Sequence, residues 1–252
     1  AIQNLKKMGI KIALSTAREY SSTKYISKQI NCDYGVFSNG SHILDINKLK
    51  TLKCSLLETK AVLEIYNYCK QNNLYIHLNQ EFCEVSDQMN YFNLKHNILN
   101  QNYPDELKSA CFLVDNLYEI VIVSEQKLDT TIKKIQDILK KYNLFISEYN
   151  KDLYEHVIGK KINYIEIGST KDTKASGLIT LSKILNIPIE EVLVIGDGDN
   201  DLEMLSEFPN SICMSNGTVN AKKLARYITK KDNNNSGVAE GLNYYIIGGV
   251  KE

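Results

Sequence analysis

Three aspartates stand within five residues of one another, at Asp197, Asp199 and Asp201, directly after the apolar stretch 192–195. Carboxylates packed this closely repel one another, and a hard cation with oxygen ligands, Mg²⁺ before any other, stabilises them together. A stretch as apolar as 192–195 is typical of a strand covered on both faces of a sheet. Ligands of open α/β sheets bind at the carboxyl ends of such strands, so the spacing predicts a magnesium site at this turn.

Three alternative roles fit the acidic turn less well. A calcium loop of the EF-hand type needs Gly at its sixth position and Glu at its twelfth, where this chain has Leu202 and Phe208. A dinucleotide-binding turn would use Gly196 and Gly198, but Asp201 replaces its third glycine. A helix cap needs one Asp only. Metal binding therefore remains the preferred interpretation.

A second polar group, Ser15-Thr16-Ala17-Arg18, follows the expected strand 10–14. A hydroxyl and backbone N–H groups at a strand-to-helix turn can bind a phosphate group. Taken alone, the same residues fit an ordinary helix cap as well or better.

Lys174 lies near the start of an expected helix, 173–185, which follows the expected strand 162–167. A lysine beside a helix N-terminus adds a mobile cation to oriented N–H groups, which suits a phosphate dianion. By itself it would be read as one of many solvated lysines, and Lys171 competes for the same role.

The composition limits the classes of partner. The chain has 252 residues with 43% hydrophobic residues, and 30 basic residues balance 30 acidic ones. This balance predicts no binding to nucleic acid or to an anionic membrane. No apolar run approaches the ~20 residues of a membrane helix. Six cysteines without a Cys-x-x-Cys pair, and four histidines without zinc-ligand spacing, indicate reduced thiols and a cytoplasmic protein.

Hydrophobic periodicity predicts two kinds of architecture. Strands and helices alternate near both ends, with helices expected at 2–8, 19–30, 173–185, 200–206, 219–227 and 237–245 and strands at 10–14, 34–38, 42–46, 192–195 and 211–214. The middle block has expected helices at 56–70 and 127–141 and strands at 74–78, 118–123 and 144–146, with loops and a weakly patterned helix at 87–109. The pattern returns to strand at 162–167.

This order predicts an α/β fold with a doubly wound, mostly parallel, Rossmann-like core sheet and an inserted α+β domain. We expect the core to comprise residues 1–48 and 166–252, and the insert residues 49–165. The polar groups described above would then lie at one edge of the core sheet.

In their order, these groups resemble motifs two, three and four of the phosphatases of the haloacid dehalogenase (HAD) superfamily, most closely its Cof-like branch with a large inserted cap. The resemblance rests on Leu14–Arg18, Ser38–Gly40, Thr173–Leu178, Ile195–Met204 and Gly237–Ala239. The fourth motif, Gly-Asp-x-x-Asn-Asp, is the most specific of these. The sequence departs from the usual pattern at Ala17, Ala175 and Phe208-Pro209.

The resemblance implies a Mg²⁺-dependent phosphoric monoester hydrolase that acts through an aspartyl-phosphate. Thr16, Ala17, Lys174 and Asn200 would bind the phosphoryl group, and Thr16 and Lys174 would share in catalysis. The inserted block would be a cap that closes over a small phosphorylated substrate and selects it.

The same resemblance implies the metal ligands. Asp197 would bind Mg²⁺ directly and Asp201 would support the metal or its waters, whereas Asp199 stands at a variable position. Residues of the insert such as Tyr91, Phe92, His96 and His156 could face the substrate or merely pack. Neither the substrate nor the choice between monomer and dimer follows from the sequence.

The first motif of the family, Asp-x-Asp-x-Thr, supplies the nucleophile and has no counterpart here. Residues 1–32 contain no Asp, Glu19 is their one carboxylate, and Asp33 stands at the amino end of a strand. We expect roughly ~20–40 further residues in the intact protein, enough for a strand and a loop. The alternative is a natural pseudo-enzyme that binds phosphate or regulates without catalysis.

Other functions stay open at this stage. A nucleotide-binding oxidoreductase domain is disfavoured by the absent third glycine. A phosphomutase or a partner of a sugar-phosphate synthase remains possible, because a fold does not fix a substrate. A phosphatase for sugar phosphates or similar metabolites is the leading hypothesis, and the chain as it stands, without the nucleophile, is expected to be inactive.

Overall fold

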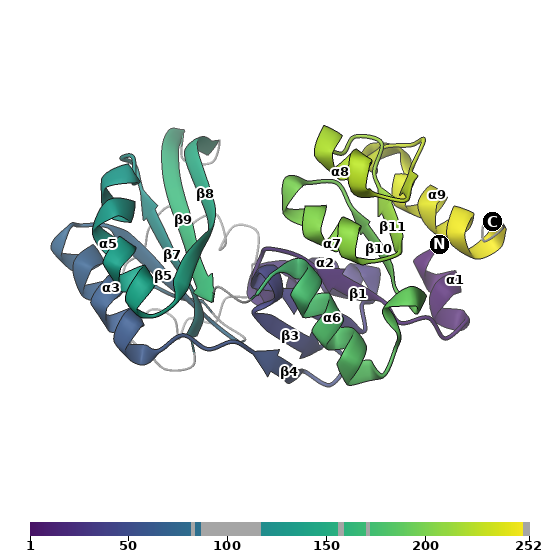
Figure 1. The fold of residues 1–252 in the computed structure, drawn as a ribbon, viewed down its shortest axis with the longest axis horizontal. Helices are drawn as coiled ribbons and strands as arrows, with labels where there is room; N and C mark the ends of the chain where they lie inside the picture. Colours follow the sequence, from purple (N-terminus) through teal and green to yellow (C-terminus); the bar gives the residue numbers. More distant parts are fainter. Residues whose placement is uncertain (82–83, 87–116, 156–158, 170–171, 249–252) are drawn as a thin grey trace. The chain divides into compact units, whose positions relative to one another are not determined.

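The computed structural model describes the chain except for residues 82–83, 87–116, 156–158, 170–171 and 249–252. The chain forms two compact units (Figure 1). The first contains residues 1–17, 30–52 and 173–252, and the second residues 18–29 and 53–172. The loops expected at 87–109, and Tyr91, Phe92, His96 and His156, lie outside the described residues.

Parallel strands dominate the first unit but fall into two sheets. One sheet has the order β1-β2-β3-β4 and the other β10-β11-β12. Their bounds are β1 (Ala13–Ser15), β2 (Tyr34–Phe37), β3 (His42–Asp45), β4 (Lys50–Cys54), β10 (Leu193–Gly196), β11 (Asn210–Cys213) and β12 (Tyr227–Ile228). β1 pairs parallel with β2, and β10, β11 and β12 are parallel, whereas β3 runs antiparallel to β2. β1 and β10 are both edge strands.

One helix of the first unit joins the two sheets. The unit contains α1 (Ile2–Lys7), α6 (Lys174–Leu185), α7 (Leu202–Glu207), α8 (Val219–Leu224), α9 (Gly237–Asn243) and the short turns η1 (Ser38–Gly40), η3 (Ile189–Glu191), η4 (Asp199–Asp201), η5 (Asn233–Asn235) and η6 (Tyr244–Gly248). Leu178 of α6 shares one buried apolar cluster with Val36 of β2 and Val194 of β10. α6 is therefore fixed against both sheets.

The second unit is built on an antiparallel sheet of order β6-β5-β7-β9-β8. Its elements are α2 (Tyr20–Ile30), α3 (Thr59–Gln71), α5 (Asp129–Lys141), β5 (Tyr75–Gln80), β6 (Glu84–Ser86), β7 (Leu117–Ser124), β8 (Leu144–Glu155) and β9 (Lys160–Ser169). α3 and α5 lie side by side on one face of the sheet (Figure 1), where alternate strand residues such as Ile76, Ile120 and Ile165 meet them in one apolar core. Near the ends of this unit Lys53 forms an ion pair with the buried carboxylate of Asp172, 119 residues away.

β9 corrects one expectation. We expected strand 162–167 to mark the return to the parallel core, but β9 pairs antiparallel with β7 and β8. Its alternation of apolar and polar residues suits a sheet with one helix-covered face, whereas core strands such as β10 are nearly all apolar. The expected limit at 165/166 falls inside β9, and the units divide after Asp172.

Three short strands, β4, β6 and β12, were not expected from the sequence. β4 has little apolar alternation, and β12 occupies two residues of what we predicted as the end of helix 219–227. α8 ends at Leu224, because Ala225 has extended backbone angles and leads into the pairing of β12 with β11. Among the described residues no helix combines the length and the apolar character needed to span a bilayer.

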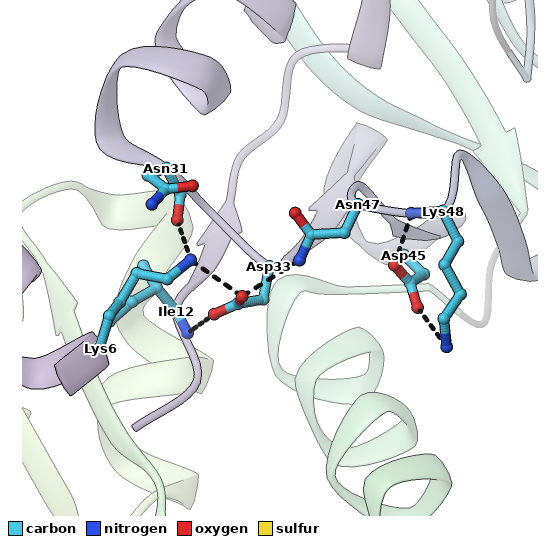
Figure 2. Close-up of polar contacts among 7 residues, drawn as sticks. All are labelled: Lys6, Ile12, Asn31, Asp33, Asp45, Asn47 and Lys48. Atoms are coloured by element: carbon cyan, nitrogen blue, oxygen red, sulfur yellow. Dashed lines mark hydrogen bonds and ion pairs between the residues drawn. The ribbon is translucent and has the colours of Figure 1, made fainter. Parts of the chain in front are cut away.

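A buried carboxylate ties together the amino ends of the strands in the first unit (Figure 2). Asp33 accepts hydrogen bonds from Lys6 Nζ at 2.9 Å, Ile12 N at 2.9 Å and Asn47 Nδ2 at 3.2 Å, and Lys6 also donates to Asn31 O at 2.6 Å. Burial alone would raise the pKa of Asp33, but these donors and the charge of Lys6 hold that pKa below its ordinary value. Asp33 thus fixes the start of β1. It does not belong to the opposite edge of the sheet, where the parallel strands have their carboxyl ends.

Replacing Asp33 with Asn should lower the free energy of unfolding by about 2 kcal/mol at pH 7, because charge-assisted hydrogen bonds are lost. A lowered pKa contributes stability above the ordinary Asp value near ~4, and this contribution disappears as the pH falls through the folded-state pKa. The difference from wild type in urea unfolding should therefore shrink at low pH. Asp137→Asn, on an exposed position of α5, is the control; equal effects of the two changes would contradict the assignment.

His42 in β3 is fully buried beside the ring of Phe37, with Nε2 3.1 Å from Thr51 Oγ1. Burial lowers the pKa of His42 to about 4. Between the ordinary His pKa of about 6.5 and the folded-state pKa of about 4, His42 is therefore protonated in the unfolded chain but not in the folded chain.

We expect this difference to destabilise the fold on acidification. The stability contributed by neutral His42 is present above about 6.5 and falls by about 2 kcal/mol on going from pH 7 to pH 5. His42→Gln, which cannot ionise, should lose that part of the pH dependence in urea unfolding measured at both pH values. An unchanged pH dependence in this variant would show that His42 is not the responsible group.

Candidate active site

The start of α6 is fixed by a reciprocal pair of hydrogen bonds. Thr173 Oγ1 accepts from Ser176 N at 3.1 Å, and Ser176 Oγ accepts from Thr173 N at 2.9 Å. These bonds satisfy donors that the first turn of a helix leaves unpaired. Lys174 is consequently the first residue of a well-anchored helix, where its position is set by the backbone.

Lys174 forms a buried ion pair with the acidic turn. Its Nζ lies 2.7 Å from Asp201 Oδ1, and both side chains are only 8% exposed. Burial alone would raise the pKa of Asp201, but Lys174 and the N–H groups of Gly198 and Asp197 hold that pKa below its ordinary value. The carboxylate is therefore ionised, and the ammonium group is held at the carboxyl end of β10.

Asp201 also shapes the turn itself. Its Oδ2 accepts from Asp197 N at 2.9 Å and from Gly198 N at 3.0 Å. A side chain on Gly196 would approach Asp201 within 2.7 Å, and one on Gly198 would approach Asn200 Oδ1 within 2.7 Å. Gly196 leaves room for the buried Asp201 side chain, which folds back over the backbone of the turn.

Thr218 is a contributor that the sequence analysis missed. It donates from Oγ1 to Asp199 Oδ1 at 2.8 Å and from its N–H to Asp197 O at 2.9 Å. The same hydroxyl accepts from Ala221 N at 3.2 Å and caps α8. The signal available in the sequence was a Thr directly before a short helix. This signal does not predict the contact with the acidic turn, because that contact joins two loops that are separate in the sequence.

Asp197 and Asn200, both predicted site residues, have exposed side chains on this turn. The Asp199 side chain is also exposed, and it accepts a hydrogen bond from Thr218 Oγ1. The turn therefore presents two carboxylates and one amide to solvent, and Thr218 holds one of the carboxylates.

Thr16 lies at the carboxyl end of β1. Its N–H donates to Val36 O at 2.9 Å, and its carbonyl accepts from Asn39 N at 3.2 Å. The neighbouring Ser15 Oγ is buried and has no hydrogen-bond partner among the described residues. The backbone of the predicted phosphate-binding segment, which includes Ala17, is therefore anchored to β2 and to the turn that follows it.

Contacts within the first unit connect the predicted site residues. Thr16 is bonded to the turn after β2, and that turn packs against Thr173 at the start of α6. Lys174 is paired with Asp201, which holds the backbone of Asp197. Lys171, the competing lysine, lies outside the described residues.

The carboxylates present fit Mg²⁺ better than a metal that needs a full protein cage. In the described part of the chain no group of three or more His, Cys, Asp or Glu side chains could enclose a metal. Mg²⁺ commonly binds through one or two carboxylates together with waters and substrate phosphate. An exposed Asp197 backed by Asp201 is a donor set of that kind.

A sequence model described as haloacid dehalogenase-like hydrolase matches residues 1–242. The chain belongs to this family. The family resemblance inferred from the motifs is thereby confirmed, as is the prediction that the protein is a hydrolase.

Similar proteins cover nearly the whole of this HAD-like hydrolase. It is 24% identical over 269 residues to the 5-amino-6-(5-phospho-D-ribitylamino)uracil phosphatase YitU of Bacillus subtilis, covering 97% of this chain and 88% of YitU. It is 21% identical over 272 residues to the phosphatase YwpJ of the same organism, covering 98% and 91%. A haloacid dehalogenase-like hydrolase structure from Bacteroides thetaiotaomicron has a TM-score of 0.78 at 22% identity, with 97% and 90% covered. The structural similarity confirms the predicted fold class.

Replacing Lys174 with Met should lower the free energy of unfolding by about 3 kcal/mol, because the buried Asp201 carboxylate loses its counter-charge. The double change Lys174→Met with Asp201→Asn should cost clearly less than the sum of the two single changes. Urea unfolding at pH 7 measures all three. The control is Lys183→Met at an exposed site of the same helix; a Lys174→Met protein as stable as this control would rule out the coupling.

Proposed function

We propose that this HAD-like hydrolase is a Mg²⁺-dependent phosphatase that acts on small phosphorylated metabolites, such as sugar phosphates. The observation that carries the proposal is the buried Lys174–Asp201 pair, which brings a lysine cation to an acidic turn at the carboxyl end of a core strand. A cation and carboxylates in one place suit a ligand that needs both, namely a phosphate group bound together with a metal.

Four residues would bind the phosphoryl group. The Thr16 hydroxyl and the Ala17 N–H would donate to its oxygens, and Lys174 would neutralise their charge. Asn200, exposed on the acidic turn, would donate from its amide. In this scheme Thr16 and Lys174 are the catalytic groups, because they stabilise charge on the oxygens while the phosphorus is attacked.

Asp197 would hold Mg²⁺ directly, and Asp201 would support the metal or its waters. When bound, the ion supplies positive charge that stabilises the phosphoryl oxygens in the transition state. Asp201 has a second task, since it orients the Asp197 backbone and Lys174. Removing the charge of either aspartate should therefore weaken metal binding, for different reasons.

The attacking group would be an aspartate carboxylate that residues 1–32 do not contain. β1 and β10 are edge strands of two sheets fixed to the same helix, and an edge strand can accept a further strand. A parallel strand ending in Asp-x-Asp-x-Thr would place its carboxylates beside Thr16 and Asp197. Attack would form an aspartyl–phosphate bond as the substrate oxygen leaves with a proton, and water would then cleave that bond.

The substrate class is supported by the names of similar proteins, one of which acts on a phosphorylated ribitylamino compound. We assign selection of the substrate to the second unit, as a cap. We also propose a reducing cytoplasm as the location, because the cysteines include no Cys-x-x-Cys pair.

The decisive experiment compares two proteins with p-nitrophenyl phosphate, with and without MgCl₂. The 252-residue chain should show no turnover. The same chain with a strand carrying Asp-x-Asp-x-Thr placed before α1 should turn over only with Mg²⁺, because the nucleophile is now present. Asp197→Asn in the extended chain should reduce kcat/KM by at least about 100-fold.

Glu203→Gln, an exposed change two residues beyond Asp201, is the matched control and should retain activity within about threefold. Metal-independent turnover, or an unaffected Asp197→Asn protein, would count against the mechanism. Mg²⁺-dependent binding of inorganic phosphate without turnover in the extended chain would favour the alternative, a catalytically silent phosphate-binding protein.

A further inference from the structure

The turn after β2 has an unusual backbone. Ser38, Asn39 and Gly40 have successive φ values of 44°, 51° and 98°, all in the left-handed region. Two of the three are not glycine, and such residues adopt this region at an energetic cost. A hydrogen bond from Ser41 N to Ser38 O at 3.1 Å closes the turn.

One side of this turn is bonded to the phosphate-binding segment. Asn39 N–H donates to Thr16 O at 3.2 Å, and Thr16 N–H donates to Val36 O at 2.9 Å just before the turn. Both backbone polar groups of Thr16 are thus held by β2 and the turn. The left-handed conformation is what directs the Asn39 N–H towards β1 rather than along its own strand.

The other side of the turn touches the backbone of α6. A Cβ on Gly40 would lie 2.3 Å from Thr173 O, and one on Gly177 would lie 2.8 Å from Gly40 Cα and 2.6 Å from Val36 Cγ1. These two glycines leave no space between the turn and the first turn of the helix. Lys174 stands on that same helical turn, between Thr173 and Gly177.

From these contacts we propose that Ser38–Asn39–Gly40 is a positioning element that sets the separation between Thr16 and Lys174. The turn acts as a spacer, bonded to one phosphate-binding residue and in backbone contact with the helix that carries the other. The inference rests on the proposed function, because it assumes that Thr16 and Lys174 bind one phosphoryl group. Small displacements of such groups have large effects on binding and rate.

Gly177→Ala tests the spacer directly. The added methyl should push α6 away from the turn and move Lys174 relative to Thr16. We expect the affinity for inorganic phosphate in the presence of Mg²⁺, measured by calorimetry on the 252-residue chain, to fall by about tenfold or more. The amide NMR signals of Thr16 and Lys174 should shift in the ligand-free variant.

Gly241→Ala on α9 is the matched control, since its Cβ would meet Ile212 Cδ1 at 2.9 Å and not the turn at residues 38–40. It should lose stability yet keep phosphate affinity within about twofold, because the turn is untouched. If Gly177→Ala does not fold, Val36→Ile presses on the same contact by one methylene group and should weaken phosphate binding in the same direction.

The outcomes separate the two proposals. Phosphate binding by wild type that is unchanged in folded Gly177→Ala and Val36→Ile would overturn the spacer but leave the proposed function intact. Equal loss of affinity in Gly177→Ala and Gly241→Ala would also overturn it, because the effect would follow general stability. Absence of phosphate binding both by wild type and by the chain extended with Asp-x-Asp-x-Thr would instead overturn the proposed function on which the spacer depends.

Discussion

The buried ion pair between Lys174 and Asp201 is the interaction on which the arrangement of the site depends. A buried pair of charges is costly to form, and it persists only where hydrogen bonds complete its environment. Here Asp201 has those bonds, because its second oxygen accepts from two backbone N–H groups of its own turn. The pair thus links a helix that follows the inserted unit to a loop that follows β10.

The rest of the first unit serves to hold that link in place. α6 is buried against strands of both sheets, so the apolar core fixes the helix that carries Lys174. Thr218 fastens the acidic turn from the other side, through one side-chain and one backbone hydrogen bond. Asp33 holds the amino ends of the strands in place through its own hydrogen bonds, away from the site (Figure 2). Asp201 and Asp33 therefore stabilise opposite ends of the strands in the first unit.

Much of this organisation could be predicted from local sequence. Strand 192–195 and the acidic turn are visible because a buried strand and a cluster of like charges are both unusual over a short stretch. The fold class followed from the order of the periodic segments. Residues 162–167 form the predicted strand, but the sheet to which they belong was not predicted. Strand periodicity is local, whereas sheet membership is decided by partners far along the chain. β4 was missed for a related reason, since its pairing compensates for a weak pattern.

The sequence proposes the residue types of the candidate site, but it does not predict the contacts between them. The sequence indicated Asp201 as a support for metal, yet the bond to Lys174 became apparent only when two segments 27 residues apart were brought together. The contact of Thr218 with Asp199 and the packing of Gly40 on Thr173 are likewise tertiary. No spacing rule links a turn after one strand to a helix that begins over 130 residues later.

The ion pair between Lys53 and Asp172 has a consequence for how such a protein could have arisen. Because these residues meet, the long stretch between them leaves the parent fold and returns to it at neighbouring points. An insertion with adjoining ends disturbs its host little, which is why domain insertions are tolerated at such places. The stretch between Lys53 and Asp172 can thus be lengthened, shortened or replaced during evolution while the strands on either side of it keep their pairing.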